Sequence, residues 1–376
     1  MKIAQVYDAV YPWEKGGIQK RVWEISRRLA DDHDIHWYGC KYWDGPDVYE
    51  REGVTLHGVT PPGELYVNGR RSIGQALSFT AHLTPTLVRT DFDLVHVQEF
   101  PYFPCFSGKA AGLLRGIPLV VTWHEIWDEY WEEYLGALGP VGRSVERLAV
   151  HLPDIHVAVS RRTRADVEAM ADCKAHLVPN GISLEEIRTT KPAADPPDVV
   201  YVGRLIEQKN VDLLLEALAA YREHRPTVTC DVIGEGPEES DLRTLATDLG
   251  VDSHIRFRGF LEEYEDVLGV IKGADVLVLP SRREGFGITA LEALACGTPV
   301  VTIDHPRNAA TALVDDGRTG YICSPESEAV ARAIEQATTT IDPEACVEAA
   351  QQYDWDQITA RMERLYKSVT ACRGYP

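Results

Sequence analysis

The sequence predicts an α/β protein of two domains, each built around a largely parallel sheet. Short apolar strands alternate along the chain with segments whose apolar residues recur at helical spacing, a pattern typical of sheets covered by helices on both faces. A proline-rich stretch without periodicity, TTKPAADPPD, divides the chain near its middle. The length of 376 residues is sufficient for two cores of ordinary size.

Composition limits the classes of partner and the compartment. The net charge is −20, which argues against nucleic-acid binding because that function requires a basic face. No apolar run is long enough to span a membrane, and the N-terminal MKIAQVYDAVYPW lacks the apolar stretch and the cleavage site of a signal peptide. The eight cysteines form no C-x-x-C pair, so we expect free thiols in a reducing cytoplasm.

The first domain is expected over residues 1–188. Its apolar runs and helical stripes alternate, and this alternation predicts a parallel sheet with helices on both faces. The expected strands are 2–7, 35–39, 54–59, 94–97, 119–122 and 155–160, and the expected helices are 18–30 and, approximately, 72–89, 106–115 and 138–150.

A glycine pair, Gly16 and Gly17, precedes the first helix. The free N–H groups and the positive end of the helix dipole suit a phosphate at this point, although turns also use glycine pairs. Another face of this helix is basic and carries Lys20, Arg21, Arg27 and Arg28. We interpret the basic face as solvent-exposed, with a contact to an anionic membrane surface as the alternative.

Polar and aromatic residues follow the strand at 119–122. The His124-Glu125 pair suggests a zinc protease, but Asp128 stands where the H-E-x-x-H motif needs its second histidine, so we discard zinc. His124 is then either a structural histidine or a ligand contact. The neighbouring aromatic residues favour packing, with stacking on a sugar or a lipid chain as the alternative. They are Trp123, Trp127, Tyr130, Trp131 and Tyr134.

The second domain is expected over residues 198–354, after a linker at about 189–197. It opens with a strand at 199–202 that ends in Gly203-Arg204, and a helix begins near Asn210. Arg204 and Lys209 therefore flank one loop at the carboxyl end of a strand. Two cations that converge before a helix N-terminus form an anion site, and two exposed surface cations are the alternative interpretation.

The stretch CDVIGEGPEESDLRTLATDLG at 230–250 predicts a strand, a turn and a helix. A dinucleotide-binding fingerprint fails here, because Glu239 stands at the third glycine position and the neighbouring acids would repel a pyrophosphate. A nicotinamide-dependent dehydrogenase is therefore disfavoured.

The most informative stretch is ADVLVLPSRREGFGITALEALACGTPVVT at 274–302. A buried strand breaks at a proline, passes a loop with two glycines, and continues as a helix and a further strand, which makes a βαβ unit. Glu284 lies in the loop and Glu292 about one turn into the helix. Gly285 and Gly287 let the backbone approach a ligand at the helix N-terminus. A loop charge and a solvated helix residue are the alternative interpretation of the two acids.

This stretch resembles the E-x7-E element of retaining glycosyltransferases of the GT-B fold, in particular the family 4 group, across PSRREGFGITALEALACGTPVV. GRLIEQK at 203–209 is similar to that family's G-R-L-x-x-x-K motif. The resemblance implies two Rossmann-like domains facing across a cleft, with a C-terminal helix at about 355–372 that crosses back to the N-terminal domain. VPNGI at 178–182 matches the place where such proteins pass from the first domain to the second.

The resemblance also implies roles for single residues. Those implied for catalysis are Glu284, His124, Arg204 and Lys209. Donor binding is divided among four parts of the nucleotide sugar. The implied diphosphate contacts are Gly16, Gly17, Gly203, Arg204 and Lys209, and Glu292 is implied at the ribose. The implied sugar contacts are Glu284, Gly285, Phe286, Gly287 and His124, and the implied base contacts are Arg258 and Phe260.

The implied function is metal-independent, retaining transfer of a hexose-type sugar from a UDP or GDP sugar to a hydroxyl acceptor, either lipid-linked or a growing surface glycan. The nucleotide sugar is a co-substrate, and no further cofactor is expected. The implied location is the cytoplasm, with a peripheral position at the inner membrane face as an alternative. Pro306-Arg307-Asn308 departs from a glycine-rich turn of many relatives, which leaves the specificity open. A sugar-nucleotide epimerase, a phosphorylase, a non-catalytic subunit and a hydride-transfer enzyme stay open as alternatives.

Overall fold

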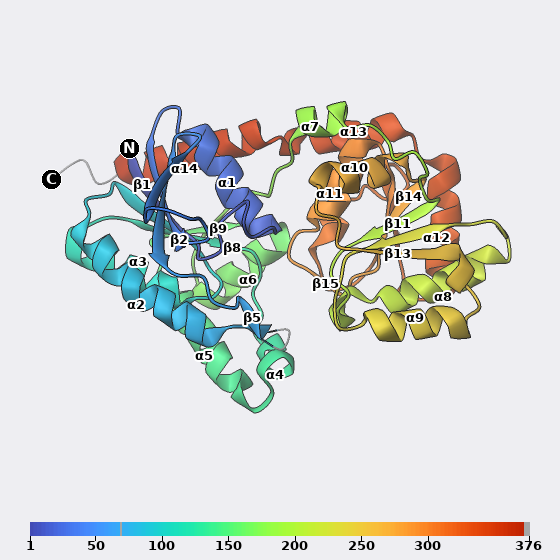
Figure 1. The fold of residues 1–376 in the computed structure, drawn as a ribbon, viewed down its shortest axis with the longest axis horizontal. Helices are drawn as coiled ribbons and strands as arrows, with labels where there is room; N and C mark the ends of the chain where they lie inside the picture. Colours follow the sequence, from blue (N-terminus) through green and yellow to red (C-terminus); the bar gives the residue numbers. More distant parts are fainter. Residues whose placement is uncertain (68–69, 372–376) are drawn as a thin grey trace. The chain divides into compact units, whose positions relative to one another are not determined.

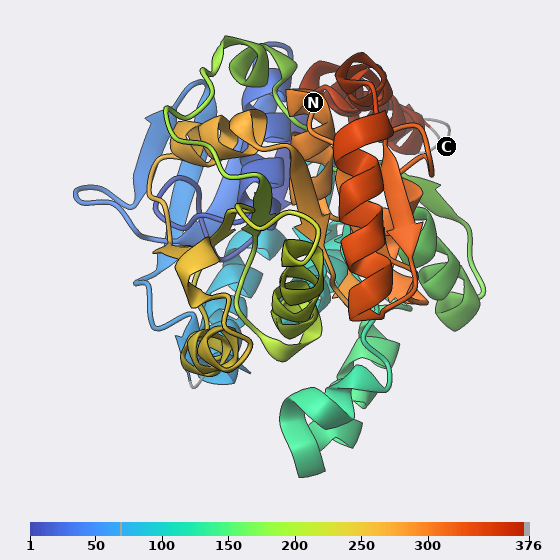
Figure 2. The same ribbon diagram turned by 90° about the vertical axis from the view of Figure 1, so that its right-hand side faces the viewer.

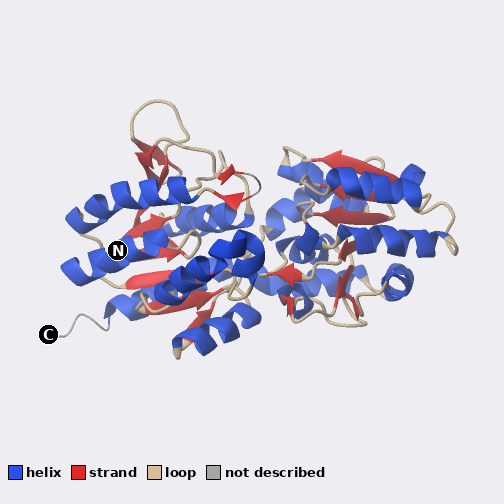
Figure 3. Cartoon of the chain, turned by 90° about the horizontal axis from the view of Figure 1, so that it is seen from below, coloured by secondary structure: helices blue, strands red, loops and turns tan. Residues whose placement is uncertain are grey.

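The computed structural model describes residues 1–67 and 70–371 (Figure 1). The chain divides into two compact units. The first unit comprises Met1–Asn180 together with the C-terminal segment that begins at Trp355, and the second comprises Gly181–Asp354. In each unit, helices lie on both faces of a central sheet (Figure 3). The predicted α/β class is confirmed for both units.

The first unit contains an eight-stranded sheet in the order β10-β9-β8-β7-β1-β2-β4-β3. Neighbouring strands are parallel, except that β3 is antiparallel to β4. The sequence predicted the parallel strands except β10, and it missed the antiparallel edge strand β3. The strands are β1 (Lys2–Val6), β2 (Asp34–Cys40), β3 (Val48–Arg51), β4 (Val54–Thr60), β7 (Leu94–Gln98), β8 (Leu119–Trp123), β9 (Ile155–Ala158) and β10 (Ala175–Leu177), with a separate hairpin of β5 (Tyr66–Val67) and β6 (Arg70–Arg71).

Helices cover both faces of this sheet and bury two apolar clusters. They are α1 (Gly17–Leu29), α2 (Ile73–Arg89), α3 (Phe103–Arg115), α4 (Tyr130–Leu135), α5 (Gly139–Ala149), α6 (Arg161–Ala171) and α14 (Trp355–Ala371), with the short turn η1 (Gly136–Leu138) between α4 and α5. The paired helices α4 and α5, coloured teal, extend outward from the first unit (Figure 2).

The C-terminal helix α14 belongs to the core of the first unit. Its Ile358 and Met362 are buried in the same cluster as Val22 and Ile25 of α1. Polar contacts add to this packing: Gln5 Nε2 donates to the Tyr366 hydroxyl at 3.1 Å. The predicted return of the last helix to the first domain is therefore confirmed, although its expected end at Cys372 lies outside the described residues. The seven cysteines of the described part of the chain are free thiols.

The second unit contains a six-stranded, fully parallel sheet in the order β13-β12-β11-β14-β16-β18. A second ladder of two short strands, β15 (Arg283–Glu284) and β17 (Arg307–Asn308), lies outside this sheet. The sheet strands are β11 (Val199–Val202), β12 (Cys230–Ile233), β13 (Ile255–Gly259), β14 (Val276–Leu279), β16 (Val300–Ile303) and β18 (Gly320–Cys323). The helices are α7 (Leu184–Thr189), α8 (Val211–Arg222), α9 (Glu239–Asp248), α10 (Tyr264–Gly273), α11 (Ile288–Cys296), α12 (Ser327–Thr340) and α13 (Pro343–Ala350), and the short 3-10 turns are η2 (Glu207–Lys209), η3 (Asp252–His254), η4 (Ala309–Ala312) and η5 (Gln351–Tyr353).

The strand order of the second unit reverses between β11 and β14. From β11 the chain adds β12 and β13 on one side, and it then returns to place β14 on the other side of β11. Parallel sheets bind ligands beyond the carboxyl ends of the strands at such a reversal. The loops that follow β11 and β14 are therefore positioned to build a ligand site, and these two loops carry both motifs that the sequence singled out.

The division between the units lies earlier than the linker expected at 189–197. It falls between Asn180 and Gly181, inside the VPNGI turn. The segment expected to be a linker packs on α10 of the second unit, where Ala193 N donates to Gly269 O at 2.8 Å and Lys272 Nζ donates to Thr190 O at 2.8 Å. The expected ranges 1–188 and 198–354 are shifted accordingly. Proline content correctly marked an irregular segment, but it did not reveal that this segment is fixed by a neighbouring helix.

Within the described residues, no helix is both long enough and apolar enough to cross a membrane.

Candidate functional site

The loop after β11 brings two cations to the carboxyl end of the sheet. Gly203 follows the strand, Arg204 is exposed, and Lys209 ends the turn η2 with a largely buried side chain. A side chain at Gly203 would collide with the Tyr201 hydroxyl, which lies 2.7 Å from the Cβ position. The described part of the chain supplies no ion-pair partner for Arg204, so its guanidinium is available to a ligand.

The loop after β14 brings Glu284 into direct contact with that first loop. Lys209 Nζ donates to Glu284 Oε1, and Ser281 Oγ donates to the same oxygen at 3.0 Å. Both partners of the ion pair are largely buried. The two motifs, separate in the sequence, therefore meet in one polar cluster at the strand-order reversal. The interpretation of Glu284 as an ordinary exposed loop charge is wrong.

Glu292 lies in the middle of α11 and is 6% exposed. The Tyr264 hydroxyl, at the first residue of α10, donates to Glu292 Oε1 at 2.5 Å. Burial and the nearby Glu292 carboxylate raise the pKa of Tyr264 well above its ordinary value, so the phenol stays protonated and acts as the donor. The alternative of a solvated helix residue is therefore wrong for Glu292 as well.

The glycine-rich turn between the two acids requires a residue without a side chain. Gly287 has a φ of 88°, in the left-handed region, and a Cβ there would lie 2.5 Å from the Cβ of Ala310. The Phe286 ring is buried and packs against Tyr353 with 6.1 Å between the ring centroids. Phe286 therefore contributes its backbone to this turn, while its side chain anchors the turn to the unit. Gly285 lies between Phe286 and the ladder residue Glu284.

The segment that departs from the resembling family lies against Glu284. Arg307 and Asn308 form β17, which pairs with Arg283 and Glu284. Asn308 is buried, and its amide nitrogen donates to Thr302 Oγ1 at 2.9 Å. This chain therefore has a structured polar support at the place where the sequence departs from the glycine-rich turn of the resembling family.

Arg258, expected in the base pocket, is held by a buried acid. Asp231 accepts from Arg258 at 2.8 Å and from Arg256 at 2.5 Å, and Asp231 is fully buried. Phe260 behaves differently, because its side chain is 51% exposed at the end of β13 and its backbone N–H donates to Glu235 Oε1 at 3.3 Å. Both predicted base contacts are exposed, but the Arg258 guanidinium is engaged by Asp231, whereas the Phe260 ring is not held by an ion pair.

In the first unit, His124 follows β8 and is fixed by three hydrogen bonds, one to its ring and two to its backbone. Its Nε2 contacts Gln98 Oε1 at 2.8 Å, its N–H donates to Glu99 Oε1 at 2.8 Å, and its carbonyl accepts from Thr163 Oγ1 at 3.2 Å. Burial, assisted by the charge of Arg21, lowers the pKa of His124 well below its ordinary value. The imidazole is therefore neutral at physiological pH.

The sequence interpretation gave no role to Glu99, which is 3% exposed and directly follows β7. Its Oε1 accepts the N–H groups of both His124 and Glu125, at 2.8 and 3.3 Å. Burial raises the pKa of Glu99 to about 8. The available signal was its position directly after an apolar strand, beside the strand that precedes His124.

Gly16 and Gly17 lie exposed at the N-terminus of α1, where the N-cap residue, Gly16, has no side chain that could cap the helix. The basic face that follows is not a free surface, and this corrects the earlier interpretation. Arg21 is fully buried and donates to Val178 O at 3.0 Å and to Asn180 Oδ1 at 3.1 Å. Arg28 pairs with Asp356 of α14 at 2.6 Å. These two cations satisfy carbonyl and carboxylate groups inside the first unit.

The aromatic residues after β8 form a packed cluster. Trp131 is buried and packs at a tilt against Trp127, with 4.8 Å between the ring centroids, and Trp123 is fully buried in the sheet. Tyr134 uses its hydroxyl to accept from the Arg71 N–H at 2.6 Å. These contacts favour the packing interpretation of the aromatic residues.

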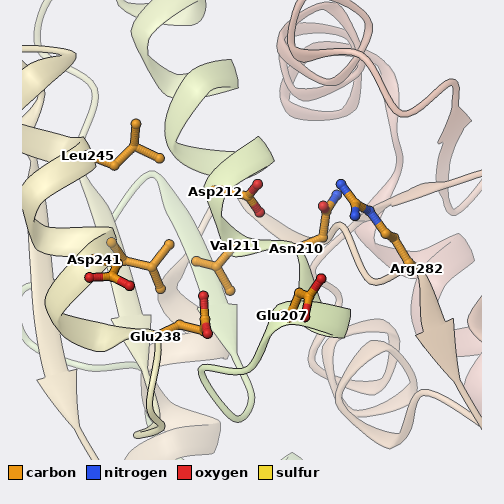
Figure 4. Close-up of a pocket in the computed structure, with 9 residues that line it drawn as sticks. Glu207, Asn210, Val211, Asp212, Glu238, Asp241, Leu245 and Arg282 are labelled. Carbon is orange, nitrogen blue, oxygen red and sulfur yellow. The ribbon is translucent and has the colours of Figure 1, made fainter. Parts of the chain in front are cut away.

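A pocket of about 350 Å³ opens at the N-terminal ends of α8 and α9 (Figure 4). Glu207, Asp212, Glu238 and Asp241 supply four carboxylates to its wall, against the single guanidinium of Arg282. This charge would repel a diphosphate. Neither Arg204 nor Lys209 lines this acidic pocket.

Sequence comparisons identify the class to which this fold and site belong. The family described as Glycosyltransferase Family 4 matches residues 15–186, and the family described as Glycosyl transferases group 1 matches residues 183–353. A GDP-mannose-dependent α-(1-6)-phosphatidylinositol monomannoside mannosyltransferase of Mycolicibacterium smegmatis is 32% identical and covers 83% of this chain and 82% of its own. The chain belongs to family 4 of the glycosyltransferases, also named group 1.

Further relatives and solved structures agree with this assignment. Glycogen synthase of Mycobacterium tuberculosis is 28% identical over 100% of this chain and 96% of its own length. Sucrose-phosphate synthase of Thermosynechococcus elongatus superposes with a TM-score of 0.80 at 21% identity, covering 99% of both chains. Anabaena HepE in complex with UDP and glucose superposes with a TM-score of 0.74 at 22% identity, over 98% of this chain and 100% of its own. The fold is the GT-B fold.

Family membership defines the reaction class. The protein is a retaining glycosyltransferase that moves a sugar from a nucleotide sugar. Hydride transfer is thereby set aside. Across residues 1–67 and 70–371, no group of three or more His, Cys, Asp or Glu side chains is arranged to hold a metal ion.

Proposed function

We propose that the enzyme transfers a hexose from a UDP or GDP sugar to a hydroxyl of a lipid-linked or growing glycan acceptor. The contact between Lys209 and Glu284 is the observation that carries this proposal, because it joins a diphosphate-binding motif to a sugar-binding element at a strand-order reversal. Relatives named for phosphatidylinositol mannosides and for glycogen support a glycan or a lipid-linked glycan as the acceptor.

Arg204 and Lys209 bind the donor diphosphate in this proposal. Negative charge grows on the leaving phosphate as the bond to the sugar breaks, and fixed cations aimed at that charge lower the barrier. Lys209 is held at the site by Glu284, and it turns part of this contact toward a phosphate oxygen when the donor binds. Arg204 supplies the second charge and, unlike Lys209, is not committed to a carboxylate.

Glu284 accepts from hydroxyl groups of the donor sugar, and the backbone of Gly285–Gly287 lies beside it. Glu292 accepts from the ribose hydroxyls. Phe260 offers an exposed aromatic face to the base, whereas Arg258 supports the sheet through Asp231. The roles of Gly16, Gly17 and His124 at the diphosphate and the sugar stay predictions, as do a peripheral membrane contact and a cytoplasmic location.

The reaction retains the configuration of the sugar, and we propose same-face attack. The bond between the anomeric carbon and the phosphate oxygen breaks, and a bond from that carbon to the acceptor oxygen forms on the same face. The acceptor proton passes to the leaving phosphate oxygen. His124 is neutral, so it serves as a hydrogen-bond partner and not as an acid.

Calorimetric titration with UDP, GDP, ADP, CMP and NAD tests the donor assignment. Binding of one nucleoside diphosphate, weakened about tenfold in both Arg204→Ala and Glu292→Gln, supports the proposal. Arg282→Ala is the matched control, because it removes an exposed cation of the neighbouring loop that is given no donor role. Folded protein that binds none of the diphosphates, or an inverted product anomer in NMR, would overturn the proposal.

A further inference from the structure

Helices α10 and α11 are joined by a hydrogen bond that reaches into the candidate donor site. Tyr264 is the first residue of α10, and its hydroxyl donates to Glu292 Oε1 at 2.5 Å. Such a short bond to a carboxylate oxygen is typical of a charge-assisted hydrogen bond. Glu292 is itself 6% exposed, so its charge needs this kind of support inside the unit.

A glutamate side chain has three rotatable bonds, and a carboxylate that recognises vicinal hydroxyls must be held in one orientation. The Tyr264 phenol fixes one oxygen of Glu292 and thereby sets the direction of the carboxylate plane. The ring of Tyr264 is rigid, and the residue is fixed at the start of a helix, so its hydroxyl has little freedom of its own. The Tyr264 hydroxyl is therefore placed to hold the Glu292 carboxylate, which is proposed to bind the ribose.

We propose that Tyr264 is a positioning residue that orients Glu292 for recognition of the donor ribose. This inference rests on the proposed function, because it gives Glu292 a ribose contact. It goes further in predicting that the discrimination between ribose and deoxyribose depends on a residue outside the E-x7-E element.

A purely structural role for Tyr264 would consist of packing α10 on α11. The same two helices are joined by a second hydrogen bond, in which Thr298 Oγ1, just after α11, donates to Ile271 O near the end of α10 at 2.7 Å. Thr298 is also buried, and its hydroxyl bonds to a backbone carbonyl of α10 and not to the Glu292 carboxylate. Thr298→Val is therefore a matched control that loses a bond between α10 and α11 and leaves Glu292 unchanged.

The test compares the affinity of the enzyme for its nucleoside diphosphate and for the 2′-deoxy and 3′-deoxy analogues. The variants are Tyr264→Phe, Glu292→Gln and Thr298→Val, all measured by calorimetry, with circular dichroism to confirm folding. We expect the wild-type enzyme to prefer the ribonucleotide over at least one analogue by about tenfold, the value of one well-made hydrogen bond. Tyr264→Phe keeps the ring but should reduce this ratio to about threefold or less, while Thr298→Val should keep it.

The outcomes distinguish the positioning role of Tyr264 from the ribose contact of Glu292. If Glu292→Gln abolishes the ratio and Tyr264→Phe leaves it intact, the positioning role is wrong and the ribose assignment stands. If Glu292→Gln leaves the ratio intact, the ribose assignment fails and the inference fails with it. If Tyr264→Phe and Thr298→Val reduce affinity for all three nucleotides equally, Tyr264 acts only through helix packing, which also overturns the inference.

Discussion

Lys209 and Glu284 are 75 positions apart in the chain, and the ammonium of the first donates to the carboxylate of the second. Each belongs to a different loop of the second unit, one after β11 and one after β14. The pair holds two opposite charges at a place where a diphosphate and a sugar are proposed to bind. Substitution of each partner should therefore affect a different quantity, either nucleotide affinity or kcat.

Removal of each partner should act on a different step. Lys209→Met should weaken binding of the nucleoside diphosphate about tenfold, because a charge-assisted contact is lost. Glu284→Gln should leave that affinity unchanged or slightly improved, because Lys209 is released toward the phosphate, yet it should lower kcat by about a hundredfold. Calorimetry and initial rates measure the two effects. Equal losses of nucleotide affinity in both variants would contradict this division.

The base contact should depend on Phe260 and not on Arg258. Phe260→Ala removes an exposed ring and should weaken nucleotide binding about five- to tenfold, in line with the value of stacking. Arg258→Ala should lower the free energy of unfolding by about 1 kcal/mol, since Arg256 still pairs with Asp231 and the lost pair is partly exposed. The ratio of affinities for UDP and GDP should stay constant in Arg258→Ala, and a changed ratio would restore its predicted role.

Gly287 should tolerate no side chain. Gly287→Ala combines an unfavourable positive φ with a collision against Ala310, and we expect a loss of about 2–4 kcal/mol in the free energy of unfolding. Gly317→Ala is the control, because Gly317 has a φ of 76° but open space around the Cβ position. Its loss should be about 1 kcal/mol. Chemical denaturation compares the two variants, and equal losses would mean that the close approach to Ala310 is unimportant.

Glu99 should make stability depend on pH in an unusual direction. Its folded pKa, raised to about 8 by burial, lies above the ordinary value near 4.3, so the folded state binds more protons between these values. This group therefore destabilises the fold progressively as the pH rises from about 5 to 8. Glu99→Gln should remove this dependence, so the gain in Tm of the variant over the wild type should be larger at pH 8.5 than at pH 5.5. A pH-independent difference would show that Glu99 does not titrate in this range.

Much of the second unit follows from local patterns in the chain. The strands at 199–202, 276–279 and 300–303 begin and end where the apolar runs predict, because buried parallel strands have few other compositions. The loops that carry Arg204 and Glu284 are predictable for the same reason. The contact between them is not, because it depends on the strand order and not on either segment alone.

The wrong predictions share one physical cause. A helical or proline-rich pattern in the sequence does not show which other segment will pack against it. Arg21 lies on a basic helical face, yet the turn at 178–180 covers it and accepts its hydrogen bonds. The prolines near 189–197 mark an irregular backbone, yet α10 fixes that backbone in place. Tyr264 and Glu99 lie outside any recognised motif, and only the fold shows which side chains they support.

The position of α14 has a consequence for the order in which the chain acquires structure during synthesis. The second unit is one continuous segment whose ends meet, since Ile182 N donates to Tyr353 O at 2.9 Å. All of its residues have been translated before Trp355 is added. The first unit begins first but depends on Met362 and Tyr366 to fill its core beside α1. The half of the protein that the ribosome makes first is therefore the half that completes its native packing last.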